Sequence, residues 1–196
     1  MNRRVLLAAL LFAGLAGCGK PGPTFHSIDV TGADYGHGFA LTDHAGQPRT
    51  LADYKGKLVT LFFGYTHCPD VCPTSLASMK QALTLLGADA AKVQVLFITV
   101  DPERDTAELL ANYVPKFDPS FVGLRGNAAA TEAVAKEYRV FYRKVPGTSE
   151  GQYTLDHTAG TYVHDTQGRL RLFIRHGETP KNMADDLRML LNLAGN

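Results

Sequence analysis

The feature that most restricts the fold is an apolar run of β-branched and aromatic residues, Leu58–Tyr65 (LVTLFFGY). A run without polar alternation is typical of a strand buried on both faces, as in parallel sheets covered by helices. A second such run follows at Val93–Val100. Between the two runs, Pro73–Leu86 has apolar residues at helical spacing, and Gly87 provides a stop signal. Strand, helix and strand in this order predict a parallel βαβ unit.

The rest of the chain is expected to extend this unit into one α/β domain of residues 39–196. The further predicted elements are a hairpin over Phe39–Tyr54, helices around Thr106–Val114 and Ala129–Tyr138, a strand near Phe121–Leu124, a polar insertion at Arg143–Asp156, a hairpin of Gly160–His164 with Leu170–Arg175, and a helix from Pro180. The fold class is therefore α/β, with a mixed central sheet, helices on both faces and an N-terminal β-hairpin.

The first residues of the chain have the pattern of a secretory signal peptide. Met1–Arg4 is cationic, and the apolar stretch Val5–Ala16 is shorter than the roughly 20 residues that a transmembrane helix needs. The stretch ends in Leu15–Cys18 (LAGC), which resembles a bacterial lipobox. We expect residues 1–17 to be removed and Cys18 to carry a diacylglyceryl lipid; an ordinary small-residue cleavage site is the alternative.

Residues 18–38 are predicted to be a flexible tether between the lipid and the folded domain, because Lys20–Gly38 is rich in proline and glycine without an apolar period. The formal charge of +1 becomes −1 when Arg3 and Arg4 leave with the signal peptide. This near-neutral charge argues against nucleic acid as a partner. The predicted membrane attachment therefore depends on the lipid anchor.

Two of the three cysteines, Cys68 and Cys72, lie between the first buried run and the first helix, in the segment Gly64–Pro73 (GYTHCPDVCP). The carboxyl ends of strands in open α/β sheets are where ligands bind, and a helix start lowers the pKa of a nearby thiol. Three residues between the cysteines allow either a disulfide or a chelate ring. The motif alone leaves a structural disulfide, a redox-active pair and a metal site open.

A metal site needs a further ligand, and His157 is the favoured candidate. It precedes the predicted strand Gly160–His164, and in a thioredoxin-like sheet the loop entering that strand lies beside the cysteines. Two thiolates and one imidazole form a soft, incomplete set that suits Cu(I) and holds Cu(II) with an added oxygen ligand, whereas structural zinc favours four ligands. The histidines expected outside this set are His26, His37, His44, His67, His164 and His176.

Three separated motifs resemble the Sco/SenC family of copper chaperones. They are Phe62–Thr74, then Ile98–Thr106 (ITVDPERDT), and finally Asp156–Thr158 with Tyr162. They occur in the family's order, and the resemblance covers nearly all of residues 39–193. The lipobox departs from family members that use a transmembrane helix, which affects only the expected mode of anchoring.

The resemblance implies a thioredoxin-like fold and a membrane-anchored protein that faces the periplasm. It implies copper bound by Cys68, Cys72 and His157, with Asp156 orienting the histidine. The implied function is copper delivery to the copper A centre of cytochrome c oxidase subunit II, or to another exported cuproprotein, with copper supplied by a donor protein. Family members are also implicated in keeping the thiols of that centre reduced.

Two enzymatic alternatives use the same cysteines. In a thiol-disulfide oxidoreductase, Cys68 and Cys72 would form a redox-active pair, although thioredoxin-like reductants have two residues between their cysteines and a proline where His157–Tyr162 has none. Val71–Thr74 resembles a peroxiredoxin fragment, but the proline and threonine that precede the reactive cysteine in that family are absent. We therefore rank a metallochaperone first, an accessory thiol-disulfide reductase second and a peroxidase last.

Overall fold

The two buried runs form the centre of the structure, a computed structural model that describes residues 22–149 and 151–195. They are the parallel strands β4 (Leu58–Gly64) and β5 (Val93–Thr99), which lie side by side. Every residue of β4 is buried, and all but Gln94 in β5. The continuous apolar composition of both runs follows from this burial on two faces.

Within the described residues, β4 and β5 belong to an eight-stranded mixed sheet with the order β1-β10-β9-β4-β5-β6-β2-β3. The other six strands are β1 (Ile28–Asp29), β2 (Ala40–Asp43), β3 (Pro48–Thr50), β6 (Val122–Arg125), β9 (Gly160–His164) and β10 (Leu170–Arg175). β6 runs parallel to β5, whereas β9 runs antiparallel to β4. The predicted N-terminal hairpin is confirmed as β2 and β3, which lie at one edge of the sheet.

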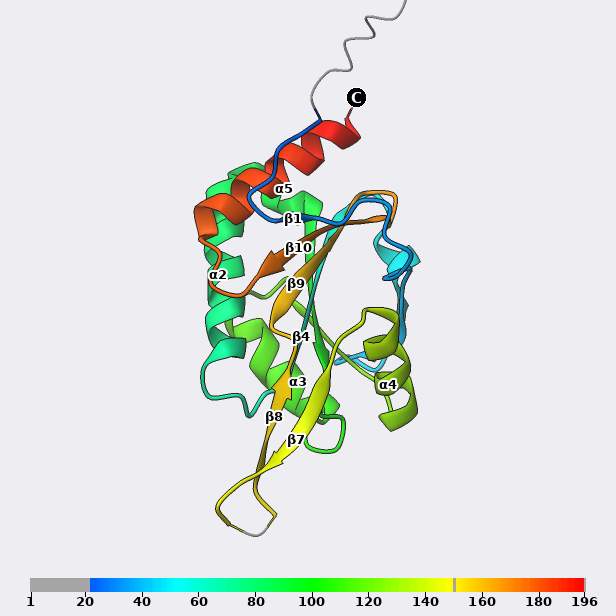
Figure 1. Ribbon diagram of the computed structural model, residues 1–196, viewed down its shortest axis with the longest axis vertical. Helices are drawn as coiled ribbons and strands as arrows, with labels where there is room; N and C mark the ends of the chain where they lie inside the picture. The colour runs from blue at the N-terminus through cyan, green and yellow to red at the C-terminus, as the bar shows by residue number, and fades with distance from the viewer. Residues whose placement is uncertain (1–21, 150, 196) are drawn as a thin grey trace, which may run out of the picture.

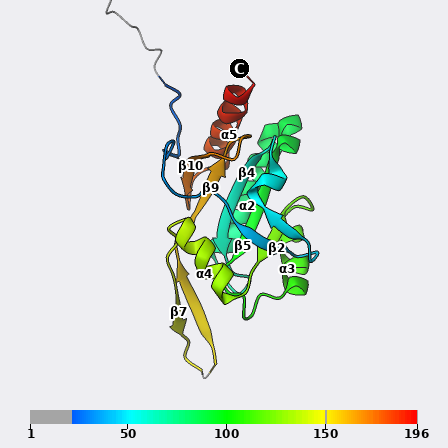
Figure 2. The same cartoon turned by 90° about the vertical axis from the view of Figure 1, so that its right-hand side faces the viewer.

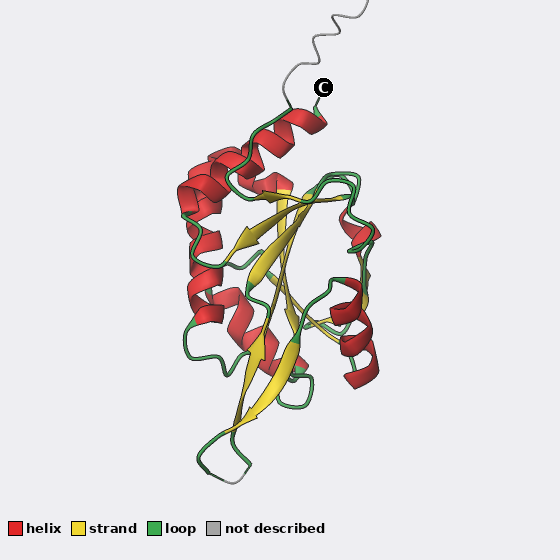
Figure 3. Cartoon of the chain, viewed as in Figure 1, coloured by secondary structure: helices red, strands yellow, loops and turns green. Residues whose placement is uncertain are grey.

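Helices cover both faces of this sheet, as Figures 1 and 2 show. Helices α2 (Val71–Leu86) and α5 (Pro180–Ala194) pack against each other on one face. Helix α4 (Ala128–Glu137) lies on the opposite face. Figure 3 shows the resulting layers of helix, sheet and helix, which confirm the predicted α/β class. The remaining helical segments are α3 (Ala107–Tyr113) and the 3-10 turns η1 (Leu51–Tyr54), η2 (Gly87–Lys92) and η3 (Val114–Lys116).

Local sequence explains where α2 begins and ends. It starts at Val71, two residues before the predicted Pro73, so that Cys72 and Pro73 both lie in the first turn. Proline is tolerated there because the first N–H groups of a helix have no partner within the helix. The helix ends at Leu86, and the next residue, Gly87, has a positive φ of 64°, which glycine adopts without strain.

The predicted polar insertion is a second, separate hairpin. Its strands are β7 (Tyr142–Pro146) and β8 (Tyr153–His157), which pair antiparallel and project from the main sheet (Figure 1). The hairpin exposes most of its residues, with Leu155 buried. Its polar composition reflects this exposure. His157 is the last residue of β8, and not a loop residue as the sequence suggested.

The predicted flexible tether is wrong for residues 25–38, because this segment is packed on the domain. β1 pairs with β10, and the buried Asp186 carboxylate accepts hydrogen bonds from the backbone N–H groups of His26 (2.9 Å) and Ser27 (2.8 Å). These hydrogen bonds involve the backbone of residues 26–29, and backbone contacts leave no pattern of apolar side chains in the sequence. The folded domain therefore begins near residue 25, and not at residue 39.

The predicted signal peptide, residues 1–17, and the predicted lipid site, Cys18, lie outside the residues that the structure describes. Among residues 22–149 and 151–195, no helix has both the length and the apolar character needed to span a membrane.

The burial of His164 leads us to expect that the stability of the protein depends on pH. It is fully buried, with Nε2 2.9 Å from the carbonyl oxygen of Gly36 and 3.3 Å from the Tyr138 hydroxyl. Burial lowers the pKa of His164, against the opposing effects of the Gly36 carbonyl and Asp165. The unfolded state therefore binds the proton more readily. We expect the free energy of unfolding to fall as the pH drops below about 6.5, by at most about 1.4 kcal/mol per pH unit from this group.

Urea unfolding between pH 7.5 and pH 5 measures this contribution. Because glutamine does not titrate, a His164→Gln variant should lose less stability over this range than the wild-type protein. Equal losses in the two proteins would refute the assignment to His164.

Candidate metal centre

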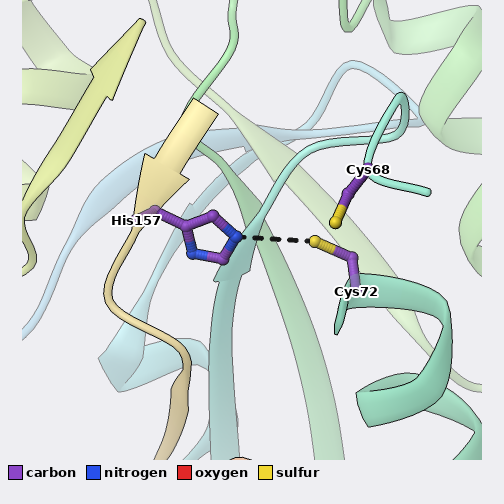
Figure 4. A group of neighbouring side chains, drawn as sticks. All are labelled: Cys68, Cys72 and His157. Atoms are coloured by element: carbon purple, nitrogen blue, oxygen red, sulfur yellow. Dashed lines mark hydrogen bonds between the residues drawn. The ribbon is translucent and has the colours of Figure 1, made fainter. Parts of the chain in front are cut away.

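Three side chains from separate parts of the chain converge at the carboxyl end of β4 (Figure 4). Cys68 lies in the loop after β4, Cys72 in the first turn of α2, and His157 at the end of β8. Their ligand atoms all lie within 4.8 Å of one another, and Cys72 Sγ is 3.7 Å from His157 Nε2. Both cysteines are free thiols. The structure therefore brings together the three ligands predicted from the sequence.

The imidazole of His157 presents one nitrogen to the two sulfurs. Its Nδ1 lies 3.0 Å from the carbonyl oxygen of Thr158, which only accepts hydrogen bonds, so Nδ1 carries the proton. Nε2 therefore keeps its lone pair toward Cys72. Phe62 and Tyr65 meet the ring edge-on, with centroids 6.3 and 6.0 Å away. Burial lowers the pKa of His157, which favours the neutral form that binds metals.

The two thiols differ in their exposure. Cys72 is fully buried, whereas Cys68 is partly exposed. The helix start was expected to lower the thiol pKa, but burial raises the pKa of Cys72, so its thiol stays protonated at neutral pH without a cation beside it. A metal ion supplies the positive charge that replaces this proton. The pair therefore offers a sheltered sulfur and an accessible sulfur at the same site.

Gly64 leaves the space that the Cys72 sulfur occupies. A Cβ atom at Gly64 would lie 2.8 Å from Cys72 Sγ and 2.9 Å from ring carbons of Phe62 and Phe97. These distances are shorter than carbon and sulfur atoms tolerate, so a side chain at residue 64 would displace its neighbours. Glycine at this position is a requirement of the site.

A buried carboxylate, Asp105, holds the loop that carries Cys68. Its Oδ2 accepts hydrogen bonds from the Thr66 backbone N–H (3.0 Å) and the Thr99 hydroxyl (2.5 Å), and its Oδ1 accepts one from the Thr66 hydroxyl (2.6 Å). The carboxylate is completely buried. Because Thr66 is two residues before Cys68, these bonds fix the start of the loop.

The hairpin that carries His157 is fastened to the segment after β5. The Arg104 guanidinium stacks 3.5 Å from the centre of the Tyr153 ring, donates to the Tyr153 carbonyl oxygen (2.9 Å) and pairs with Asp101. The Tyr153 hydroxyl donates to the same carboxylate at 2.8 Å. Nearer the centre, the Leu155 N–H donates to the Tyr65 hydroxyl (3.2 Å). These contacts hold β8, and therefore His157, against the cysteine loop.

Asp156 does not make the orienting contact that the sequence suggested. Its carboxylate is exposed and pairs with Arg143 at 2.9 Å, while the Thr158 carbonyl occupies the Nδ1 side of His157. Adjacent residues in a strand point to opposite faces, so the side chain before His157 faces away from the imidazole. Asp156 acts on the histidine through its charge, which raises the pKa of His157 against the effect of burial.

The histidines excluded on sequence grounds lie outside this cluster of three donors. His67 is the nearest in sequence, and it is half exposed, with Nδ1 3.1 Å from the Thr66 hydroxyl. Two thiols and one imidazole form a soft set with fewer than four protein ligands, which suits copper better than structural zinc. The cluster therefore fits the metal that the sequence motifs imply.

Comparison with known proteins decides the family. The sequence model of the SCO1/SenC family matches residues 29–192. The chain belongs to the SCO1/SenC family. It is 34% identical to the bovine mitochondrial SCO2 homolog, over 96% of this chain and 75% of that protein. It spans between about half and three quarters of the length of the curated relatives that it matches first.

Solved structures of SCO proteins have the same fold. Bradyrhizobium japonicum ScoI with copper bound aligns with a TM-score of 0.73 and 46% identity, over 80% of this chain and 99% of that one. A SCO1/SenC family lipoprotein from Bacillus anthracis aligns with a TM-score of 0.67 and 25% identity, over 80% of this chain and 93% of that one. The predicted thioredoxin-like fold of the family is confirmed.

Replacing Asp105, a residue to which the sequence analysis assigns no role, is expected to weaken copper binding at the centre. Its only sequence signal was its place in the motif Ile98–Thr106. An Asp105→Asn variant keeps the size of the side chain but turns one acceptor into a donor. We expect it to lower copper affinity about tenfold, as loss of a group that supports a ligand does.

Competition with a chromophoric Cu(I) chelator measures this affinity. Asp89→Asn is the matched control, because Asp89 is only half-buried and pairs with Lys92 in η2, beyond the end of α2 opposite to Cys72. An Asp105→Asn protein with wild-type affinity would show that the loop keeps its position without the carboxylate.

Proposed function

We propose that this protein is a copper chaperone whose reduced form binds one copper ion through Cys68, Cys72 and His157. The observation that carries the proposal is the convergence of these three donors within 4.8 Å, with the His157 lone pair directed toward the sulfurs. The copper-bound structure of the Bradyrhizobium relative supports copper as the metal. Copper is the cargo here, so the site must also release it.

The different exposure of the two sulfurs supports transfer by ligand exchange. A recipient ligand can reach the copper beside Cys68, which is partly exposed, while the buried Cys72 still holds it. The recipient that family membership favours is the copper A centre of cytochrome c oxidase subunit II, with another exported cuproprotein as the alternative. A separate donor protein supplies the copper.

The leader sequence supports a location at the cell membrane, facing the periplasm. In this proposal residues 1–17 are a signal peptide and Cys18 carries the lipid. The lipobox pattern Leu15–Cys18 supports it, as does the family relative from Bacillus anthracis that is described as a lipoprotein. Mass spectrometry of the mature N-terminus tests this part, since an unmodified Cys18 or cleavage elsewhere would refute it.

A second candidate function is thiol-disulfide reduction by Cys68 and Cys72. The observation that favours it is a partly exposed thiol beside a buried one, as needed for attack and then resolution. The Cys68 thiolate would attack a partner disulfide and release one partner thiol. Cys72 would then attack the mixed disulfide and release the second thiol, leaving a Cys68–Cys72 disulfide. Two electrons pass to the partner, and the two thiol protons balance its two new thiols.

A His157→Ala variant separates the two functions. We expect it to lose at least about tenfold in copper affinity and to change the copper-thiolate spectrum, because one of three ligands is missing. Both cysteines remain, so it should still reduce a partner disulfide. Copper titration, absorption spectroscopy and a thiol-exchange assay are run on the same preparations.

The matched control is His37→Ala, which removes an exposed histidine that pairs with Glu137 and lies outside the cluster. If His157→Ala binds copper with wild-type affinity and spectrum, the proposed site is wrong. If the wild-type protein binds no copper but reduces a partner disulfide, the reductase function replaces the chaperone function.

A further inference from the structure

The chain enters the folded domain at the end opposite to the metal centre. In Figure 1 the segment before β1 runs beside the C-terminal end of α5, at the top of the view. The start of α2, which carries Cys72, and the end of β8, which carries His157, lie in the lower half. The longest axis of the molecule is vertical in this view, so the two features are separated along it.

The entering segment is held firmly to this end. Asp186 is only 1% exposed, and its carboxylate accepts hydrogen bonds from two consecutive backbone N–H groups. Oδ1 accepts from His26 and Oδ2 accepts from Ser27. Directly after them, β1 pairs with β10, and the Val30 N–H donates to the Arg171 carbonyl oxygen at 2.9 Å. The first of these fixed points in the chain is His26, so the Asp186 carboxylate sets where any upstream anchor must attach.

Chain length limits how far the domain can move from a lipid on Cys18. Eight Cα-to-Cα steps separate Cys18 from His26. Even a fully extended chain of this length spans at most about 28 Å. The end of the domain that carries Asp186 is therefore confined near the membrane surface, whereas the far end is not.

Two exposed apolar side chains lie at the same end. Among the described residues, four large hydrophobic side chains are exposed: Ile28 (37%), Leu85 (53%), Phe141 (59%) and Leu193 (43%). Leu85 is at the C-terminal end of α2 and Leu193 is at the C-terminal end of α5, whereas Ile28, in β1, lies level with the middle of the sheet. The Arg188 guanidinium donates to the Leu85 carbonyl oxygen at 3.0 Å, which ties the C-terminal end of α2 to the middle of α5. Phe141 alone lies near the metal centre, hydrogen-bonded to Thr158.

We propose that the end of the domain that carries Leu85 and Leu193 rests on the lipid bilayer, so that the metal centre faces away from the membrane. This inference rests on the proposed lipidation of Cys18. The short connection brings this end to the bilayer, and burial of the exposed leucines in the interface stabilises that orientation. A copper donor or recipient then approaches from the aqueous side, at the far end of the long axis.

The absence of tryptophan from the sequence provides a direct test. Single-tryptophan variants Leu85→Trp, Leu193→Trp and Phe141→Trp are prepared as the full lipidated protein. They are bound to vesicles of phosphatidylethanolamine and phosphatidylglycerol with brominated acyl chains, which quench only nearby tryptophan. We expect quenching at residues 85 and 193 at least about twofold stronger than at residue 141. Equal quenching at the three positions, or the strongest quenching at residue 141, would overturn the proposal.

An Asp186→Asn variant tests the carboxylate contact itself. The amide keeps one acceptor for the two backbone N–H groups and loses the charge, so the entering segment is held less tightly. Introduced into the Leu193→Trp protein, it should reduce the quenching at residue 193 while the protein stays on the vesicles. Unchanged quenching would show that Asp186 does not set the orientation.

Vesicle flotation separates failure of the orientation from failure of the anchor. A protein that floats with the vesicles but shows no positional difference refutes the orientation and leaves the lipidation intact. A protein with an unmodified N-terminus that does not float refutes both. Copper titration of the same variants reports on the metal centre independently of either result.

Discussion

Replacing Cys72 by alanine is expected to lower copper affinity at least about a hundredfold. Loss of a group that only supports a metal ligand costs about ten- to a hundredfold, and Cys72 is itself one of the three proposed ligands. Its sulfur is also the buried one, so solvent cannot replace it readily. Competition with a chromophoric Cu(I) chelator under reducing conditions measures the affinity.

Ser78→Ala is the matched control for this substitution, because it also replaces a heteroatom by a hydrogen on α2 and touches none of the three donors. We expect Ser78→Ala to retain wild-type affinity. A Cys72→Ala protein that binds copper within a few-fold of the wild type would show that Cys72 is not a ligand.

The second large effect is expected from Gly64→Ala. The added methyl group would lie 2.8 Å from Cys72 Sγ and 2.9 Å from two buried aromatic rings. Overpacking of this kind costs about 1 to 3 kcal/mol of unfolding free energy. The sulfur is among the atoms that must move, so copper affinity should also fall, by about tenfold. Urea unfolding and the chelator competition are measured on the same protein.

The control is Gly22→Ala, since nothing lies within 4 Å of a Cβ atom at Gly22. It should leave both stability and affinity unchanged. A Gly64→Ala protein as stable as the wild type, with the same copper affinity, would contradict the close contact between residue 64 and the sulfur.

Apolar patterning predicted most of the fold, because buried strands and amphipathic helices have distinct periods. Leu58–Tyr65 and Val93–Val100 became β4 and β5 with nearly the expected bounds. The hairpin β7–β8 was not predicted because it pairs outside the main sheet and is largely exposed. Its sequence therefore lacks the alternation of apolar and polar residues that indicates a half-buried strand. The docking of residues 25–38 was missed because it depends on Asp186 and other partners far away in sequence.

The three proposed ligands could be picked out from the sequence, whereas the groups that position them could not. Cysteine and histidine have few roles at a strand-to-helix corner, so Cys68, Cys72 and His157 were identified by type and place. Asp105 holds the loop through Thr66, a contact across 39 residues that no local pattern encodes. The partner of His157 Nδ1 is a backbone carbonyl, which every residue carries, so the sequence suggested Asp156 in its place.

In the proposed function, these positioning contacts account for how one small site both holds and releases copper. Cys72 is fixed by burial, and His157 is fixed by its contact with the Thr158 carbonyl oxygen and by packing against the rings of Phe62 and Tyr65. Cys68 lies in a loop that depends on the Asp105 hydrogen bonds and is partly exposed. In the proposed transfer, a recipient ligand reaches the copper beside Cys68 while the other two ligands remain in place.

The most direct test of this account is the copper coordination in the loaded protein. X-ray absorption at the copper edge is measured on the reduced protein with one equivalent of Cu(I). The proposed site predicts two sulfur neighbours and one nitrogen neighbour, and loss of the nitrogen in His157→Ala. A copper shell of three or more sulfurs, or one with no sulfur, would contradict binding by Cys68, Cys72 and His157.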